Sequence, residues 1–233
     1  MTANQENARL ARIARGSSLL VAALVLAGAI INFLRPIYFE AAIAAVSLLI
    51  FIWLQFFANR RKGVRNPPAM QICIAVLTFT SVFVGRFFAL YKNLPGFDKS
   101  QHFLYGMIFA VCGFVLFYRL NPAARQQRIV SPATMVVFIA SFALLCGFGW
   151  EIYEFASDRL FNTNMQAWKQ GLAHGVTDTM LDLLADLVGG LAVGLTGARR
   201  MQRDPQGFFM RYWAGFFTEQ TADEPANPAA AGE

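Results

Sequence analysis

Charged residues are scarce in this chain of 233 residues: Asp, Glu, Lys and Arg make up 15% of it, against about 25% in ordinary soluble domains. Cysteine is also rare, with three residues, which excludes a disulfide-rich scaffold. Disordered and collagen-like chains are excluded because phenylalanine alone occurs 23 times. Hydrophobic residues make up 56% and the mean hydropathy is +0.44, more than a soluble surface could cover. The composition therefore predicts a polytopic membrane protein.

Six long apolar runs account for this composition. A helix that crosses the ~30 Å hydrocarbon core of a bilayer needs about 20 mostly apolar residues, and each run approaches or exceeds that length. The runs are continuous rather than alternating, which argues against membrane β-strands. We predict an all-α bundle of about six transmembrane helices over residues 17–34, 37–58, 69–91, 101–120, 130–150 and 178–197.

Basic residues are distributed unevenly between the two sides of such a bundle. Fourteen of the 20 Lys and Arg residues lie on one side, in the two terminal arms and the second and fourth connections. Cytoplasmic segments carry such an excess, so both termini are predicted to be cytoplasmic, and the net charge of +6 needs no nucleic-acid partner. The expected organisation is a cytoplasmic arm over 1–16, a membrane domain over 17–197, a basic and aromatic interfacial segment over 198–217 and a disordered tail over 218–233.

Acidic residues are missing from the inner half of the predicted membrane domain. Of the 14 acids, six lie in the terminal arms and eight lie near the outer surface or just below it. Polar residues at 98 and 102, at 151, 154 and 158, and at 178, 182 and 186 recur at spacings of three or four. Each set shares one helix face, provided that the fourth helix starts by Asp98 and the fifth continues past Trp150. With His102, the candidate site residues are Asp98, Glu151, Glu154, Asp178, Asp182 and Asp186.

The stripe on the last run reaches deepest. With a rise of ~1.5 Å per residue, Asp182 lies about 6 Å and Asp186 about 12 Å below Asp178. A charge at mid-membrane costs about 2.5–3.5 kcal/mol on insertion scales, so these acids are expected to face inward and to be protonated, paired, hydrated or bound to a cation. Arg86 has the depth to meet Asp182 or Asp186. The small-residue pair Gly190 and Gly194 favours close helix packing on the same run.

Several of these residues also have simpler interpretations. Asp98 is a suitable N-cap for the fourth helix, and Asp178 for the sixth. Glu151 fits an interfacial position beside Trp150. Asp158 and His174 (the second histidine) are expected to be solvated loop residues.

Four segments carry a resemblance to a known family: residues 97–103 (FDKSQHF), 150–155 (WEIYEF), 163–166 (TNMQ) and 178–183 (DTMLDL). Over about residues 69–197 the chain resembles the YjdF-like bacterial inner-membrane proteins, and more distantly the VanZ-like membrane proteins. The resemblance implies a multi-pass protein of the bacterial inner (plasma) membrane, with the lipid bilayer as its partner. It supplies no reaction, although VanZ-like proteins are associated with lowered susceptibility to glycopeptide antibiotics.

Three functions remain open at this stage, as does the oligomeric state. The acidic cluster could bind a divalent cation (Mg²⁺, Mn²⁺ or Zn²⁺) through its carboxylates and imidazole, and so serve a metal-dependent enzyme that acts on a lipid or lipid-linked phosphate. In that case the acids would supply ligands and a general base, and Arg86 would bind phosphate. The cluster could instead belong to a proton- or ion-coupled transporter, or hold the bundle together without catalysis.

Overall fold

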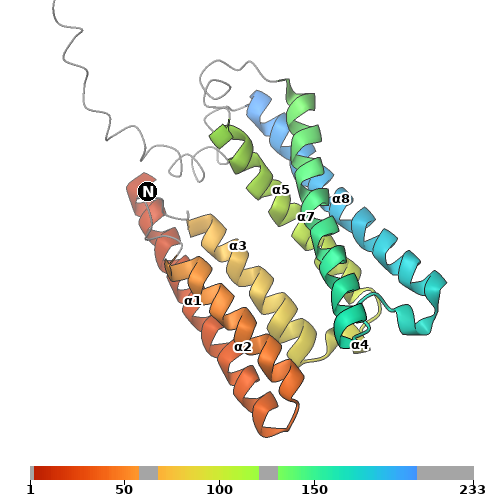
Figure 1. The fold of residues 1–233 in the computed structure, drawn as a ribbon. Helices are drawn as coiled ribbons and strands as arrows, with labels where there is room; N and C mark the ends of the chain where they lie inside the picture. The colour runs from red at the N-terminus through yellow and green to blue at the C-terminus, as the bar shows by residue number, and fades with distance from the viewer. Residues whose placement is uncertain (1–2, 58–67, 121–130, 204–233) are drawn as a thin grey trace, which may run out of the picture. The chain divides into compact units, whose positions relative to one another are not determined.

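The computed structural model describes residues 3–57, 68–120 and 131–203, and every element in these ranges is a helix (Figure 1). The described helices fall into two compact units, which divide between Phe83 and Val84. The prediction of an all-α polytopic membrane protein is confirmed. Most of the segment predicted over 198–217, and the whole tail over 218–233, lie outside the described residues.

The first unit packs three helices against one another. α1 (Ala3–Leu34) lies beside α2 (Tyr38–Ile52) and α3 (Pro68–Thr78). α2 continues into a short π-helix, η1 (Trp53–Phe57), and α3 into a longer one, η3 (Phe79–Phe87), which crosses the boundary between the units. Small and aromatic side chains from all three helices form its core, including Val25, Phe51 and Ala75.

The second unit is built on three long helices: α5 (Phe97–Leu120), α7 (Pro132–Phe161) and α8 (Leu172–Arg203) (Figure 1). The short helix α4 (Leu90–Asn93) precedes α5, and a single 3₁₀ turn, η4 (Trp168–Gln170), precedes α8. α8 packs against both α5 and α7, which also pack against each other. α7 begins sharply because the Ser131 side chain accepts a hydrogen bond from the Thr134 amide at 3.1 Å, an N-cap with proline at the first helical position.

Glycines let α8 approach both of its neighbours. A Cβ added at Gly189 would collide with the backbone of α5, and one at Gly190 or Gly194 would press on α7 at Ala143 or Val136. Side chains at these positions would push the helices apart, so the glycines are what permits the spacing. The close packing expected from Gly190 and Gly194 is therefore confirmed.

Five described helices are long and apolar enough to cross a membrane: Ala8–Leu34, Tyr38–Gln55, Pro68–Phe87, Pro132–Phe161 and Leu172–Arg200. The other predicted run, 101–120, lies within α5, which has 24 residues. The arm predicted over 1–16 is helical from Ala3 as the first part of α1. α7 continues past Trp150 to Phe161, and α8 begins before Asp178, at Leu172, so both run beyond their predicted bounds.

Candidate cation site

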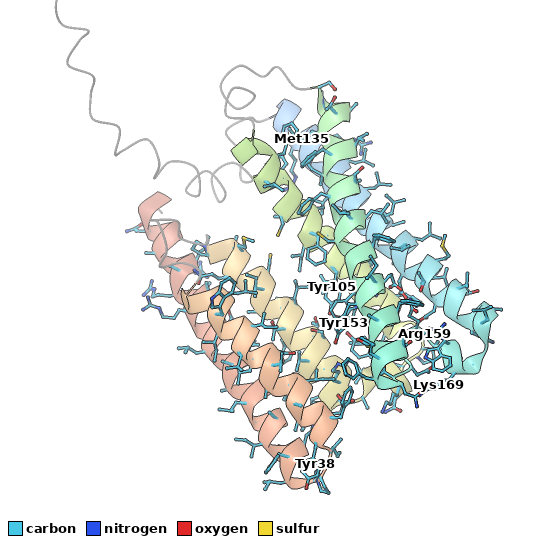
Figure 2. All side chains as sticks on the ribbon, viewed as in Figure 1. Tyr38, Tyr105, Met135, Tyr153, Arg159 and Lys169 are labelled. Atoms are coloured by element: carbon cyan, nitrogen blue, oxygen red, sulfur yellow. The ribbon has the colours of Figure 1, made fainter. Side chains whose placement is uncertain are left out.

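The candidate residues gather at one end of the second unit. α5 begins and α7 ends at this end of the unit. After a short loop that includes η4, α8 begins at the same end. In Figure 2, Arg159 and Lys169 mark this end, and Met135 lies at the other end of α7. Three helices therefore bring polar residues from well-separated positions in the sequence to a common place.

The acidic stripe of α8 faces the interior of the unit. Asp182 and Asp186 are 0% exposed, whereas Leu184 and Val188 on the same helix are 51% and 54% exposed. Apolar side chains thus point outward and carboxylates inward, as in a helix that contacts lipid on one face and protein on the other. The expected inward orientation of the stripe is confirmed.

His102 connects the three helices. Its Nδ1 lies 3.0 Å from Asp186 Oδ2 on α8. Its Nε2 lies 3.7 Å from Asp182 Oδ1 on α8 and 3.9 Å from Glu151 Oε1 on α7. The imidazole is itself buried. The hydrogen bond to Asp186 fixes the ring and turns Nε2 toward the other two carboxylates.

Lys99, which is not among the residues predicted for the site, forms ion pairs with three aspartates at the edge of the cluster. Lys99 Nζ lies 2.5 Å from Asp178 Oδ1, 2.8 Å from Asp182 Oδ2 and 3.3 Å from Asp98 Oδ2. Lys99 precedes the predicted membrane-spanning run of α5. Burial acts to lower its pKa, but the hydrogen bonds to Asp178 and Asp182 outweigh this effect, so the pKa is raised and the ammonium stays charged. The signal was present in the sequence, since Lys99 is three residues before His102 and so shares its helix face.

Five buried atoms of the candidate residues have no hydrogen-bond partner among the described residues: His102 Nε2, Glu151 Oε1, Glu154 Oε2, Asp182 Oδ1 and Asp186 Oδ1. Three of them face one another, since His102 Nε2 lies 3.7 Å from Asp182 Oδ1 and 3.9 Å from Glu151 Oε1. A buried polar atom left unsatisfied costs about 1–3 kcal/mol, so the arrangement calls for something that all three can bind.

His102 Nε2 lies within the reach of a shared metal ion from each of the two carboxylate oxygens. Metal bonds to imidazole nitrogen and carboxylate oxygen are about 2.1 Å long, so two ligands of one ion lie at most about 4.2 Å apart. Both separations at His102 Nε2 are within this limit. A carboxylate on the other imidazole nitrogen, here Asp186, is the usual support for a metal-bound histidine. Asp98, His102 and Asp182 offer ligand atoms that all lie within 4.8 Å of one another, and both aspartates also bond to Lys99 through one oxygen.

The remaining candidates lie around this centre. Glu154 is buried beside Glu151 on α7 and accepts a hydrogen bond from Trp150 Nε1 at 2.8 Å. Asp178 lies at the rim with Lys99. Arg86, in η3, is half-buried, and its suggested role as a phosphate ligand stays a prediction.

The two capping interpretations are wrong. α8 begins at Leu172, so Asp178 lies in its second turn, where Thr177 donates a hydrogen bond to the Ala173 carbonyl at 2.8 Å. α5 begins at Phe97, so Asp98 is inside the first turn rather than before it. Both aspartates are therefore placed to contact Lys99 instead of backbone amides.

The interpretation of Asp158 as a solvated loop residue is also wrong. Asp158 is buried, and its carboxylate accepts hydrogen bonds from the Thr163 hydroxyl at 2.5 Å, the Met165 amide at 2.7 Å and the Gln166 amide at 3.0 Å. His174 is exposed as expected, but it lies in the first turn of α8 rather than in a loop.

Comparison with known proteins agrees with the membrane assignment. A family model described as "Predicted membrane protein (DUF2238)" matches residues 17–203. An "Uncharacterized protein" of Thermotoga maritima is 29% identical over 126 residues, which make up 53% of this chain and 58% of that relative. No solved structure matches. The family match extends over α1 to α8 and includes every residue of the candidate site, and the chain belongs to the DUF2238 family of predicted membrane proteins.

Proposed function

We propose that this membrane protein binds a divalent cation through His102 Nε2, Asp182 Oδ1 and Glu151 Oε1, with Asp186 orienting the imidazole. The observation that carries the proposal is that the buried His102 Nε2 lies 3.7 Å from Asp182 Oδ1 and 3.9 Å from Glu151 Oε1, and that none of these atoms has a hydrogen-bond partner among the described residues. We place the protein in the bacterial inner membrane, with this site toward the outer face. The basic-residue bias and the resemblance to YjdF-like and VanZ-like proteins support that placement.

The charge of the cluster favours a cation as ligand. Its three helices contribute six carboxylates, whereas Lys99 bonds to three of these: Asp98, Asp178 and Asp182. Glu151 and Asp186 contact His102 instead, and Glu154 is buried and accepts a hydrogen bond from Trp150. A divalent ion would offset the mutual repulsion of these carboxylates. One imidazole with two carboxylates suits Mn²⁺ or Zn²⁺, and Mg²⁺ would bind mainly through the oxygens.

The same geometry suggests a second function, that of a metal-dependent enzyme acting on a phosphate. Three protein ligands leave coordination positions open, as in catalytic rather than structural metal sites. A metal with an open position polarises a phosphoryl oxygen or activates bound water. Lys99, whose side chain is 28% exposed, is a cation at the mouth of the site, and with Arg86 it could contact the phosphate of a lipid or lipid-linked molecule.

Metal titration of the purified protein tests the proposed cation site. Mn²⁺, Zn²⁺, Mg²⁺ and Ca²⁺ are added to chelator-treated protein in detergent while bound metal and the melting temperature are measured. At least one ion should bind at one per chain and raise the melting temperature by linkage. His102→Ala should abolish both effects, and His174→Ala, which removes the exposed histidine, should leave them intact. Equal binding by the wild type and His102→Ala would refute the site.

A further inference from the structure

A single buried carboxylate, that of Asp158, accepts hydrogen bonds from the loop between α7 and α8. Asp158, near the end of α7, receives hydrogen bonds from Thr163, Met165 and Gln166, two of them from backbone amides. Asn162 ends α7 in a left-handed conformation with φ of 53°, which turns the chain back so that these amides reach Asp158. A buried carboxylate that satisfies two loop amides holds the backbone of Gln166 in one place.

The side chain of Gln166 then bridges the two helices of the cation site. Its amide Nε2 lies 3.3 Å from Glu151 Oε2 on α7 and 2.9 Å from Thr179 Oγ1 on α8. An amide nitrogen has two hydrogens, so it can donate to both acceptors at once. With Oε2 engaged in this way, the other oxygen, Oε1, is the one left facing His102.

Aromatic and glycine contacts keep the loop in place. Trp168 Nε1 donates to the Thr163 carbonyl at 3.1 Å, and the Arg159 guanidinium lies 5.7 Å from the Trp168 ring. Gly175, in the first turn of α8, lies so close to Gln166 and Trp168 that a Cβ there would crowd both. The loop is therefore packed onto both helices rather than extended away from them.

We infer that Gln166 is a positioning residue of the cation site: it orients Glu151 for metal binding, and Asp158 acts through it as a clamp. This inference rests on the proposed function. The terminal torsion of a glutamate side chain is broad and only weakly restricted. The Thr179 side chain also hydrogen-bonds to Glu151, so without Gln166 the carboxylate would keep one of these two restraints, rotate more freely and lose part of its contribution to binding.

Metal affinity, measured separately from stability, tests the inference. Partners of metal ligands typically contribute about 10–100-fold in affinity. Gln166→Ala should therefore raise the Kd for Mn²⁺ within that range, while the melting temperature of the metal-free protein changes little. Lys169→Ala is the matched control: it alters an exposed residue of the same loop whose ammonium bonds to the Asn162 carbonyl, and it should leave the Kd unchanged.

If Asp158 acts through Gln166, the effects of substituting the two residues on Mn²⁺ affinity should not add. Asp158→Asn should weaken Mn²⁺ binding in the wild type but have little further effect in Gln166→Ala, because both changes remove the same restraint. An equal loss in both backgrounds would overturn the role of Asp158.

The variants distinguish the positioning role of Gln166 from the cation site itself. If His102→Ala abolishes Mn²⁺ binding while Gln166→Ala binds as tightly as the wild type, the positioning role is wrong and the cation site stands. If His102→Ala binds like the wild type, the cation site itself is wrong.

Discussion

Asp182→Asn separates the structural role of the buried carboxylate from its proposed role as a ligand. One oxygen of Asp182 bonds to Lys99 at 2.8 Å, and the other faces His102 at 3.7 Å. Removing one partner of a buried ion pair costs about 3–5 kcal/mol when the other charge is left alone. Lys99 is not left alone, because it keeps Asp178 at 2.5 Å and Asp98 at 3.3 Å. The expected loss is that of one charged hydrogen bond, about 1.5–3 kcal/mol.

The metal contributes a second, separable effect. At a free metal concentration of ~100 times Kd, binding stabilises the folded protein by about 2.7 kcal/mol. For a chain of this size, 1 kcal/mol shifts the melting temperature by about 2–4 °C. Wild-type protein should therefore melt some 5–10 °C higher with saturating metal by the same relation, whereas Asp182→Asn should melt at one temperature with and without metal.

Differential scanning fluorimetry in detergent, with and without metal, provides the measurement. Asp178→Asn is the matched control, because Asp178 bonds to the same lysine, whereas the carboxylates that face His102 are those of Glu151, Asp182 and Asp186. It should lower the melting temperature of the metal-free protein and keep the rise on adding metal. A full metal-induced rise in Asp182→Asn would refute the assignment of Asp182 as a ligand. If the metal-induced rise in melting temperature were lost only in Asp178→Asn, the metal would instead bind among the carboxylates around Lys99.

Further predictions concern topology, packing and helix ends. Reporter fusions at Lys92 and Asn162 should report the outer side and a fusion at the C-terminus the cytoplasm; a C-terminus outside would invert the orientation. Gly189→Ala should destabilise the protein by about 1–3 kcal/mol because its new Cβ meets the backbone of α5. Gly197→Ala, where nothing lies within 4 Å of the added Cβ, should be neutral or stabilise by up to about 1 kcal/mol. Ser131→Ala removes the N-cap of α7 and should cost ~1 kcal/mol in thermal unfolding.

The sequence predicts the site best where the cost of burying a charge leaves a side chain only one favourable orientation. Asp182 and Asp186 are too deep for a helix cap and too costly to face lipid, so their inward orientation followed from spacing and the price of an unpaired charge. The same spacing placed Glu151 and Glu154 on one face of a helix that continues past Trp150, as α7 does.

The sequence predicts less well where the outcome depends on contacts between distant segments. Asp158 appeared to be a surface residue because no local pattern shows that the chain turns back at Asn162 and delivers two amides to it. The sequence places the start of α8 too late because Gly175 disfavours a helix in the first turn and Thr177, in the second, resembles a cap. The first turn is stabilised by packing against the preceding loop rather than by helix propensity.

The glycines around Asp186 have a consequence for the movement of ions. A Cβ at Gly106 would collide with the backbone of Asp186, and one at Gly147 with its carboxylate. Beyond this level, Gly190 and Gly194 keep α8 against α7, and Gly189 keeps it against α5. Asp186 therefore lies at a level where α8 packs closely against both α5 and α7. Moving an ion along α8 past this level would require α8 to separate from both neighbours at once.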